Sequence, residues 1–161
     1  MQRIAIVYLI LFIGLFSCKK GKIEEKITTD AELITVLKAS PESIVIGSDS
    51  LVLKTYIWRD FMPIAEENGS PMFCINFLTD KDSLNIEQSI ILKKQYVING
   101  EKVWTSDYTE VKDPSSFYME GYISGGPKWG PDIYVDVVCE FKYLGSTYRI
   151  LAKAQEIEMT Q

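Results

Sequence analysis

The chemistry open to this chain is limited first by a residue type that it lacks. None of its 161 residues is histidine, which removes the commonest general base, the usual zinc ligand and every Ser-His or Cys-His dyad. Paired carboxylates remain, as Glu66-Glu67 in a predicted loop and as Asp136 with Glu140 on a predicted strand. Neither pair has the apolar surroundings that raise the pKa of a glycosidase acid. We therefore expect no catalytic residue and no cofactor.

One segment, 80–85, resembles a calcium loop because acids stand at alternate positions. It carries Leu84 where an oxygen ligand is needed, and it lacks the glycine of the sharp turn. We expect no metal site.

The best candidate for a binding surface is the segment 124–131, in which glycines and prolines surround a lysine and a tryptophan. Rigid loops that carry an aromatic side chain are common binding surfaces on β scaffolds. An indole can stack on a sugar ring or anchor a protein partner, although Trp129 can instead fold back over the end of the sheet. The candidate contact residues here are Gly125, Gly126, Pro127, Lys128 and Trp129.

A second candidate lies at the end of a predicted strand, where Trp58 precedes Arg59. Alternation places Arg59 on the core-facing side, so it needs a partner, for which Asp60 or a loop acid is expected. Arg59 could hold a carboxylate ligand, but we favour a role in fixing the strand end. Trp58 and Tyr122 are the residues expected to extend a glycan-stacking platform.

Two cysteines lie in different predicted strands. Cys139 belongs to an apolar face, whereas Cys74 alternates with phenylalanines and therefore occupies the less apolar face of its strand. An oxidising compartment permits a disulfide between Cys74 and Cys139, and the alternative is two buried thiols.

The first 17 residues predict export. Arg3 is their only charge, an apolar run follows, and a small residue, Ser17, stands directly before Cys18. The run is too short to span a bilayer and is typical of a signal peptide. Its end resembles the bacterial lipobox, in which the cysteine is acylated with fatty acids such as palmitate and becomes the new N-terminus. The resemblance implies a membrane anchor on Cys18, and the alternative is an ordinary signal peptide.

Length and charge bound the rest of the chain. We expect a signal peptide at 1–17, a charged tether at 18–30 and one domain at 31–161. The net charge of −5 and the lack of a basic stripe argue against nucleic-acid binding.

Short alternating runs with turn residues between them predict an all-β domain of seven to eight strands, an antiparallel β-sandwich. Residues 33–38 fit either a capped helix or a first strand, and we prefer the strand. Asn99-Gly100 predicts a type I′ hairpin. The last hairpin can turn on Leu144-Gly145, which sets Glu140 opposite Arg149, or on Gly145-Ser146. The other expected strands cover 41–46, 51–58, 72–79, 87–98, 101–108, 117–124, 133–143 and 147–157.

The segment 41–58 resembles the opening of immunoglobulin-like bacterial domains. With the signal and the strand pattern, the chain resembles the small lipoproteins common in Bacteroidota, which join a Ser-Cys lipobox, a charged tether and one immunoglobulin-like sandwich. The resemblance implies an outer-membrane lipoprotein of the cell envelope, facing the periplasm or the surface.

Our first hypothesis is a lipid-anchored module that binds an envelope protein without catalysis. The second is glycan capture with Trp129 as the stacking platform, and the third is a carboxylate-dependent hydrolase.

Overall fold

The computed structural model describes residues 26–161 apart from 64, 66, 83–85, 87–88 and 116–117. The signal peptide, Cys18, Glu66 and Leu84 lie outside the described residues. Within the described part, the chain is mostly β-strand with one helix. The elements are β1 (Lys26–Thr28), α1 (Ala31–Lys38), β2 (Ser43–Ile46), β3 (Asp49–Asp60), β4 (Met72–Asp80), β5 (Ile91–Asn99), β6 (Lys102–Asp107), β7 (Glu110–Ser115), β8 (Tyr118–Gly126), β9 (Tyr134–Tyr143) and β10 (Ser146–Thr160).

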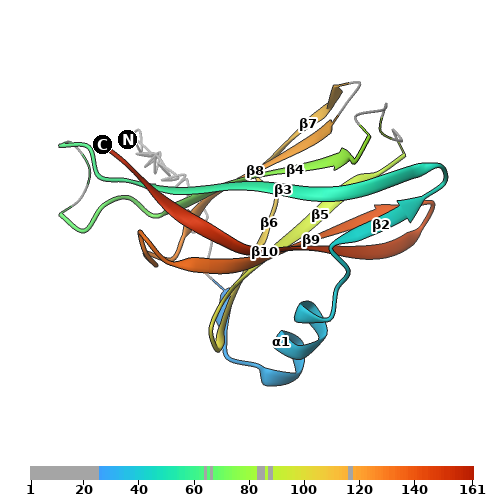
Figure 1. Ribbon diagram of the computed structural model, residues 1–161. Helices are drawn as coiled ribbons and strands as arrows, with labels where there is room; N and C mark the ends of the chain where they lie inside the picture. The colour runs from blue at the N-terminus through green and yellow to red at the C-terminus, as the bar shows by residue number, and fades with distance from the viewer. Residues whose placement is uncertain (1–25, 64, 66, 83–85, 87–88, 116–117) are drawn as a thin grey trace, which may run out of the picture.

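The strands form one curled sheet in the order β1-β6-β5-β9-β10-β3-β4-β8-β7, with β2 paired to β3 (Figure 1). Every pairing is antiparallel except that of β10 with β3, which is parallel. The curl brings β6 close to β8, so the sheet forms a half-barrel. The all-β prediction is confirmed, but an antiparallel immunoglobulin-like sandwich is not, because the sheet is single and mixed. The prediction also missed β1, inside the expected tether, and β7.

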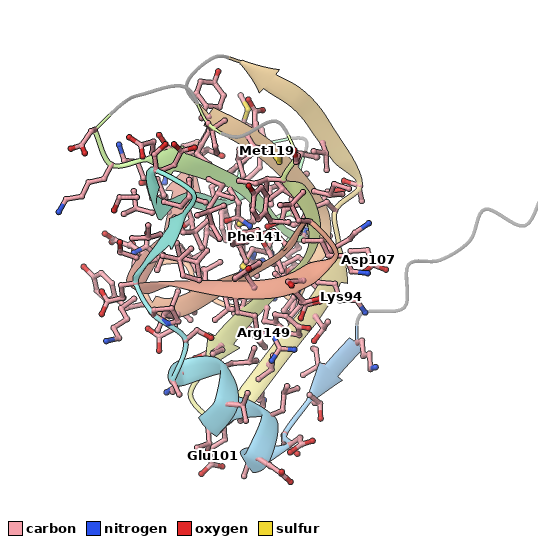
Figure 2. The ribbon with its side chains drawn as sticks, turned by 90° about the vertical axis from the view of Figure 1, so that its right-hand side faces the viewer. Lys94, Glu101, Asp107, Met119, Phe141 and Arg149 are labelled. Atoms are coloured by element: carbon pink, nitrogen blue, oxygen red, sulfur yellow. The ribbon has the colours of Figure 1, made fainter. Side chains whose placement is uncertain are left out.

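The concave side of the sheet holds the main core. Figure 2 shows Phe141 and Met119 pointing into the space that the strands enclose, and both are buried. Trp104 of β6 reaches across this space until its ring meets Gly126 of β8, where a side chain would collide with it. The core thus joins the two halves of the curled sheet.

The helix α1 corrects our preference for a strand at 33–38. Asp30 caps the helix, and its carboxylate accepts hydrogen bonds from the backbone N–H groups of Glu32 (3.0 Å) and Leu33 (3.1 Å). Leu33, Ile34 and Leu37 then point to one side at helical spacing and cover the convex side of the sheet. This second apolar cluster contains Leu37, Tyr96, Ile98, Val103, Val138 and Leu151.

The hairpin between β5 and β6 is present, but its turn differs from the prediction. Asn99 pairs with Lys102, so the two central residues are Gly100 and Glu101. Gly100 has a positive φ of 57°, whereas Glu101 does not. A glycine at the first central position is typical of a type II′ turn and not of the expected type I′ turn.

The last hairpin settles the alternative that the sequence left open. Tyr143 pairs with Ser146, so the turn lies on Leu144-Gly145, and both central residues have positive φ. Arg149 stands opposite Glu140, as that register requires, and its Nη2 lies 2.9 Å from the carboxylate. Farther along, β10 carries a bulge between Ala152 and Gln155 that strengthens its bend.

Candidate functional site

Six aromatic side chains point outward from the neighbouring strands β3, β4 and β8. Alternation along each strand sends one set of side chains into the core and leaves the other set outside. We call the outer set the aromatic face; it consists of Tyr56, Trp58, Phe73, Phe77, Tyr118 and Tyr122. Four of these rings form a continuous row across the three strands: Tyr56, Trp58, Phe73 and Tyr122.

The rings of this row are turned toward one another. Tyr56 and Trp58 stack with centroids 4.9 Å apart and planes 24° apart, and Trp58 and Phe73 stack at 5.4 Å and 17°. Phe73 and Tyr122 follow at 6.4 Å with a tilt of 36°. Because the ring planes are stacked on each other, the row presents ring edges to its surroundings and few free ring planes.

Carboxylates stand beside the row on β10. Glu158 pairs in register with Trp58, which lies two residues from Tyr56 on the same side of β3. Desolvation first, and Glu158 second, raise the pKa of Tyr56. Two residues earlier on the same side of β10, Glu156 lies opposite Tyr134, whose hydroxyl is 3.5 Å from it. Glu156, Glu158 and Tyr134 are all exposed.

Arg59 lies on the opposite side of β3 from Trp58, as alternation predicted, and is only 1% exposed. Its guanidinium donates to the carbonyl oxygens of Ser70 (2.9 Å), Lys128 (3.3 Å) and Gly130 (2.7 Å), and also to that of Asn68. The partners that the structure gives it are therefore main-chain carbonyls and not the expected acid; Asp60 instead accepts from the N–H of Met62. Burial lowers the pKa of the Arg59 guanidinium. These bonds fix two loops and support the strand-end role over ligand binding.

The glycine- and proline-rich segment is one of the loops that Arg59 holds. Gly126 and Pro127 are buried, and the half-buried Trp129 packs against the main core. Gly125 and Gly130 have φ values of 81° and 73°, a region that favours glycine. Trp129 therefore lies on the core side, whereas Trp58 and Tyr122 belong to the outer aromatic row. The candidate residues predicted from the sequence do not form one site.

Cys74 and Cys139 lie inside the half-barrel as free, fully buried thiols, and no disulfide joins them. The Tyr108 hydroxyl donates to Cys139 Sγ (3.1 Å) and accepts from Asn76 Nδ2 (2.9 Å). Asn76 also donates to Gln95 Oε1 (2.6 Å). Burial raises the pKa of Cys139 to about 12 and raises the pKa values of Cys74 and Tyr108 as well. These thiols are protonated at neutral pH, so they are poor nucleophiles.

The sequence indicated that Cys74 lies on the less apolar face of its strand. That face is indeed the less apolar one, but it is the face that is buried. Cys74 and Asn76 face the core, while Phe73 and Phe77 face outward. The inward polar residue and the outward aromatic residues invert the usual pattern, and this inversion was the signal that could have revealed the aromatic face.

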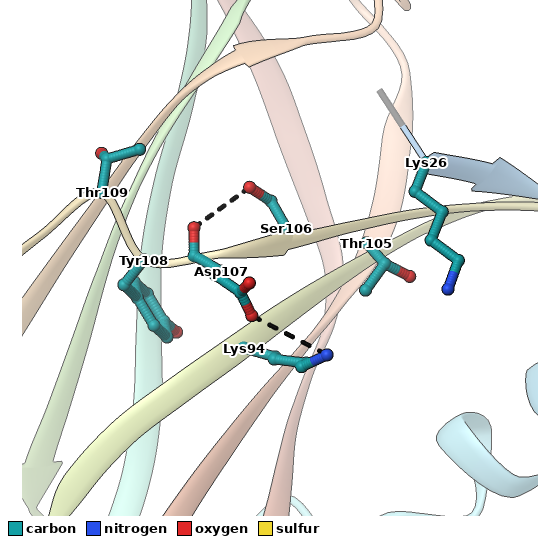
Figure 3. A pocket seen from close by; sticks show the side chains of 7 residues that line it. All are labelled: Lys26, Lys94, Thr105, Ser106, Asp107, Tyr108 and Thr109. Carbon is teal, nitrogen blue, oxygen red and sulfur yellow. Dashed lines mark hydrogen bonds and ion pairs between the residues drawn. The ribbon is translucent and has the colours of Figure 1, made fainter. Parts of the chain in front are cut away.

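A pocket of about 340 Å³ opens where β1 meets β6 (Figure 3). Lys94 and Asp107 line the pocket and form an ion pair of 3.8 Å. The Ser106 Oγ donates to the backbone carbonyl of Asp107. Asp107 is 78% exposed, so this is a solvated surface pair with little to hold a ligand. Among the described residues, no group of three or more Cys, Asp or Glu side chains is placed to bind a metal ion. In the same part of the chain, no helix has the length and apolar character needed to cross a bilayer.

Comparison of the chain with protein-family models, with curated proteins and with solved structures gives no match.

Proposed function

We propose that this protein is a lipid-anchored module of the bacterial cell envelope that binds a protein partner through its aromatic face and performs no catalysis. The observation that carries the proposal is the stacked row of Tyr56, Trp58, Phe73 and Tyr122 on the outside of the sheet. Large outward aromatic residues are common at protein interfaces and costly to leave in water.

The orientation of the rings favours a protein over a glycan. Stacking on a sugar requires a free ring plane, and in this row Trp58 has neighbours on both sides, at 4.9 Å and 5.4 Å. Ring edges with a polar rim suit the mixed apolar and polar surface of a protein partner. Glycan capture through Trp129 has less support, because Trp129 packs against the core.

The proposed location rests on the sequence of the first 18 residues. A signal peptide that ends before Cys18 supports acylation of that cysteine and attachment to the outer membrane as a lipoprotein.

The test is crosslinking in intact cells, with capture of the native anchored protein through a C-terminal tag. Trp58→Ser removes the centre of the row, and Ile91→Ser is the matched control because Ile91 is an exposed apolar residue (53%) on β5. We expect one stoichiometric partner that is lost from Trp58→Ser and kept by Ile91→Ser. Equal capture by both variants, each shown to melt like the native protein, would exclude this face as the binding surface.

A further inference from the structure

We propose that the aromatic face selects a basic partner, a strand-like segment whose arginine or lysine side chains alternate with apolar ones. This inference rests on the proposed function and adds the chemistry of the partner to it.

The first support is the balance of charge around the face. The outward ionisable side chains of β3, β8 and β10 include four acids and three bases: Asp60, Glu120, Glu156 and Glu158 against Lys54, Arg149 and Lys153. Two of these bases already pair with further carboxylates, Arg149 with Glu140 and Lys153 with Glu42, so acids remain in excess around the face. Such a surface repels phosphate groups, anionic lipid and a second copy of itself, and it attracts cations.

The second support is the placement of the two acids on β10. Glu156 and Glu158 lie on one side of the strand, beside Tyr134 and Tyr56 respectively. Tyr56 ends the stacked row and Tyr134 lies outside it, so a guanidinium could pair with either carboxylate and also lie against the ring beside it, a combination that suits arginine especially. Lysine can use the same sites as a point charge.

The third support is spacing. Residues two apart on a strand are separated by about 6.5–7 Å, which sets the distance between the backbones that carry Glu156 and Glu158. An extended partner segment repeats its own side chains at the same interval. A segment whose backbone lies along β3 would point its alternate basic side chains toward the two carboxylates on β10 and its intervening apolar side chains toward the ring edges on β4 and β8.

The experiment uses the full acylated chain, labelled with ¹⁵N-tryptophan and placed in nanodiscs of zwitterionic phosphatidylcholine. The indole signals are followed by NMR. The chain has three tryptophans, and Trp104 and Trp129 serve as internal references for Trp58. The probes are an extended peptide of alternating arginine and leucine and a counterpart with glutamate in place of arginine. We expect the arginine peptide to shift the Trp58 indole signal alone and the glutamate peptide to shift none.

The double variant Glu156→Gln/Glu158→Gln should weaken binding of the arginine peptide roughly tenfold. The control Glu32→Gln/Glu101→Gln changes the net charge equally at exposed acids on α1 and the β5–β6 hairpin, and it should bind like the native protein. Equal weakening in both variants would overturn the proposal, because net charge alone would then explain binding.

Three other outcomes would also overturn the inference. One is an equal shift of Trp58 by the glutamate peptide, which would leave an aromatic binding face without selection for cations. Another is the absence of any shift, in which case a partner lost from Trp58→Ser would still uphold the proposed function. The last is self-association that Trp58→Ser abolishes, seen by sedimentation, which would make a second copy the occupant.

Discussion

At the scale of single residues, Arg59 is the side chain on which the loops at one end of the sheet depend. Its guanidinium bonds join the carbonyls of Asn68 and Ser70 to those of Lys128 and Gly130. Arg59→Met should lower the free energy of unfolding by about 3 kcal/mol or more, because four main-chain carbonyls lose the charged donor that bonds to them in a part-buried site. Arg59→Lys should recover only part of this, since an ammonium cannot reproduce the planar fork.

Chemical denaturation with a constant m-value measures this effect, and Arg149→Met provides the control. Arg149 also has a close ion pair, with Glu140, but its side chain is 34% exposed. Glu140 is only 13% exposed but keeps the Tyr96 hydroxyl as a donor (3.1 Å), so the loss of Arg149 should cost less than that of Arg59, about 1–2 kcal/mol. Equal costs for Arg149→Met and Arg59→Met would show that Arg59 does not hold the loops.

The buried thiols predict how stability depends on pH. Cys74 and Cys139 ionise near their ordinary pKa of 9.0 in the unfolded chain and far higher in the folded protein, at about 12 for Cys139. The folded state therefore keeps its full stability below pH 9 and loses it as the pH rises above that value. The slope is at most about 1.4 kcal/mol per pH unit for each thiol.

Denaturant titrations between neutral pH and mild alkali, in the presence of a reductant, should show this decline. The variant Cys74→Ala/Cys139→Ala should be less stable at neutral pH but should lose stability less steeply above pH 9. In this double variant, stability should still fall slightly with pH at higher pH, because the pKa of Tyr108 is also raised. An unchanged slope in the double variant would contradict the assignment to the thiols.

At the scale of elements, α1 depends on one buried residue. Leu37 is fully buried against the convex side of the sheet, whereas its neighbour Val36 is 49% exposed. Leu37→Ala should cost about 3 kcal/mol, and Val36→Ala should change stability by less than about 0.5 kcal/mol. Equal effects in thermal and denaturant unfolding would show that α1 does not dock as described.

The same helix shows what local pattern could and could not predict. Asp30 and the spacing of Leu33, Ile34 and Leu37 support a helix, yet β-branched residues in a short apolar run also suit a strand. The hairpin of Asn99 and Gly100 was located correctly, but a one-residue shift of the turn changed its type. Short segments carry too few residues for the period alone to decide.

The candidate site was predictable only in part. Trp58 and Tyr122 were named from the sequence, and the opposite orientation of Arg59 followed from alternation. Tyr56, Phe73 and Glu158 were missed because their proximity depends on how β3, β4, β8 and β10 are ordered in the sheet. The parallel pairing of β10 with β3 is a long-range contact that no local pattern encodes.

At the scale of the whole molecule, the curl of the half-barrel determines which surfaces need to be covered. The curl gives the chain one concave core, which Trp104, Phe141 and the apolar residues around them fill. The convex side is therefore divided between α1, which covers the apolar cluster on β5, β6, β9 and β10, and the aromatic face on β3, β4 and β8. Among the described elements, α1 covers the first of these two convex surfaces, and the partner proposed above would cover the second.

The proposed anchor on Cys18 would determine where the aromatic face can act, so its test concerns the entire protein. We expect Cys18→Ser to move the protein from the detergent-rich to the aqueous phase in detergent partitioning. The acyl chains proposed on Cys18 would supply membrane attachment at about 0.8 kcal/mol per buried methylene, and Cys18→Ser would remove them. Cys74→Ala should stay in the detergent phase, and mass spectrometry of the native N-terminal peptide should show the added acyl mass.

Retention of Cys18→Ser in the detergent phase would contradict acylation at Cys18 while leaving the proposal of the aromatic face as the binding surface unaffected. A Cys18→Ser protein that is released and still captures the same partner would show that the anchor places the module without shaping its binding.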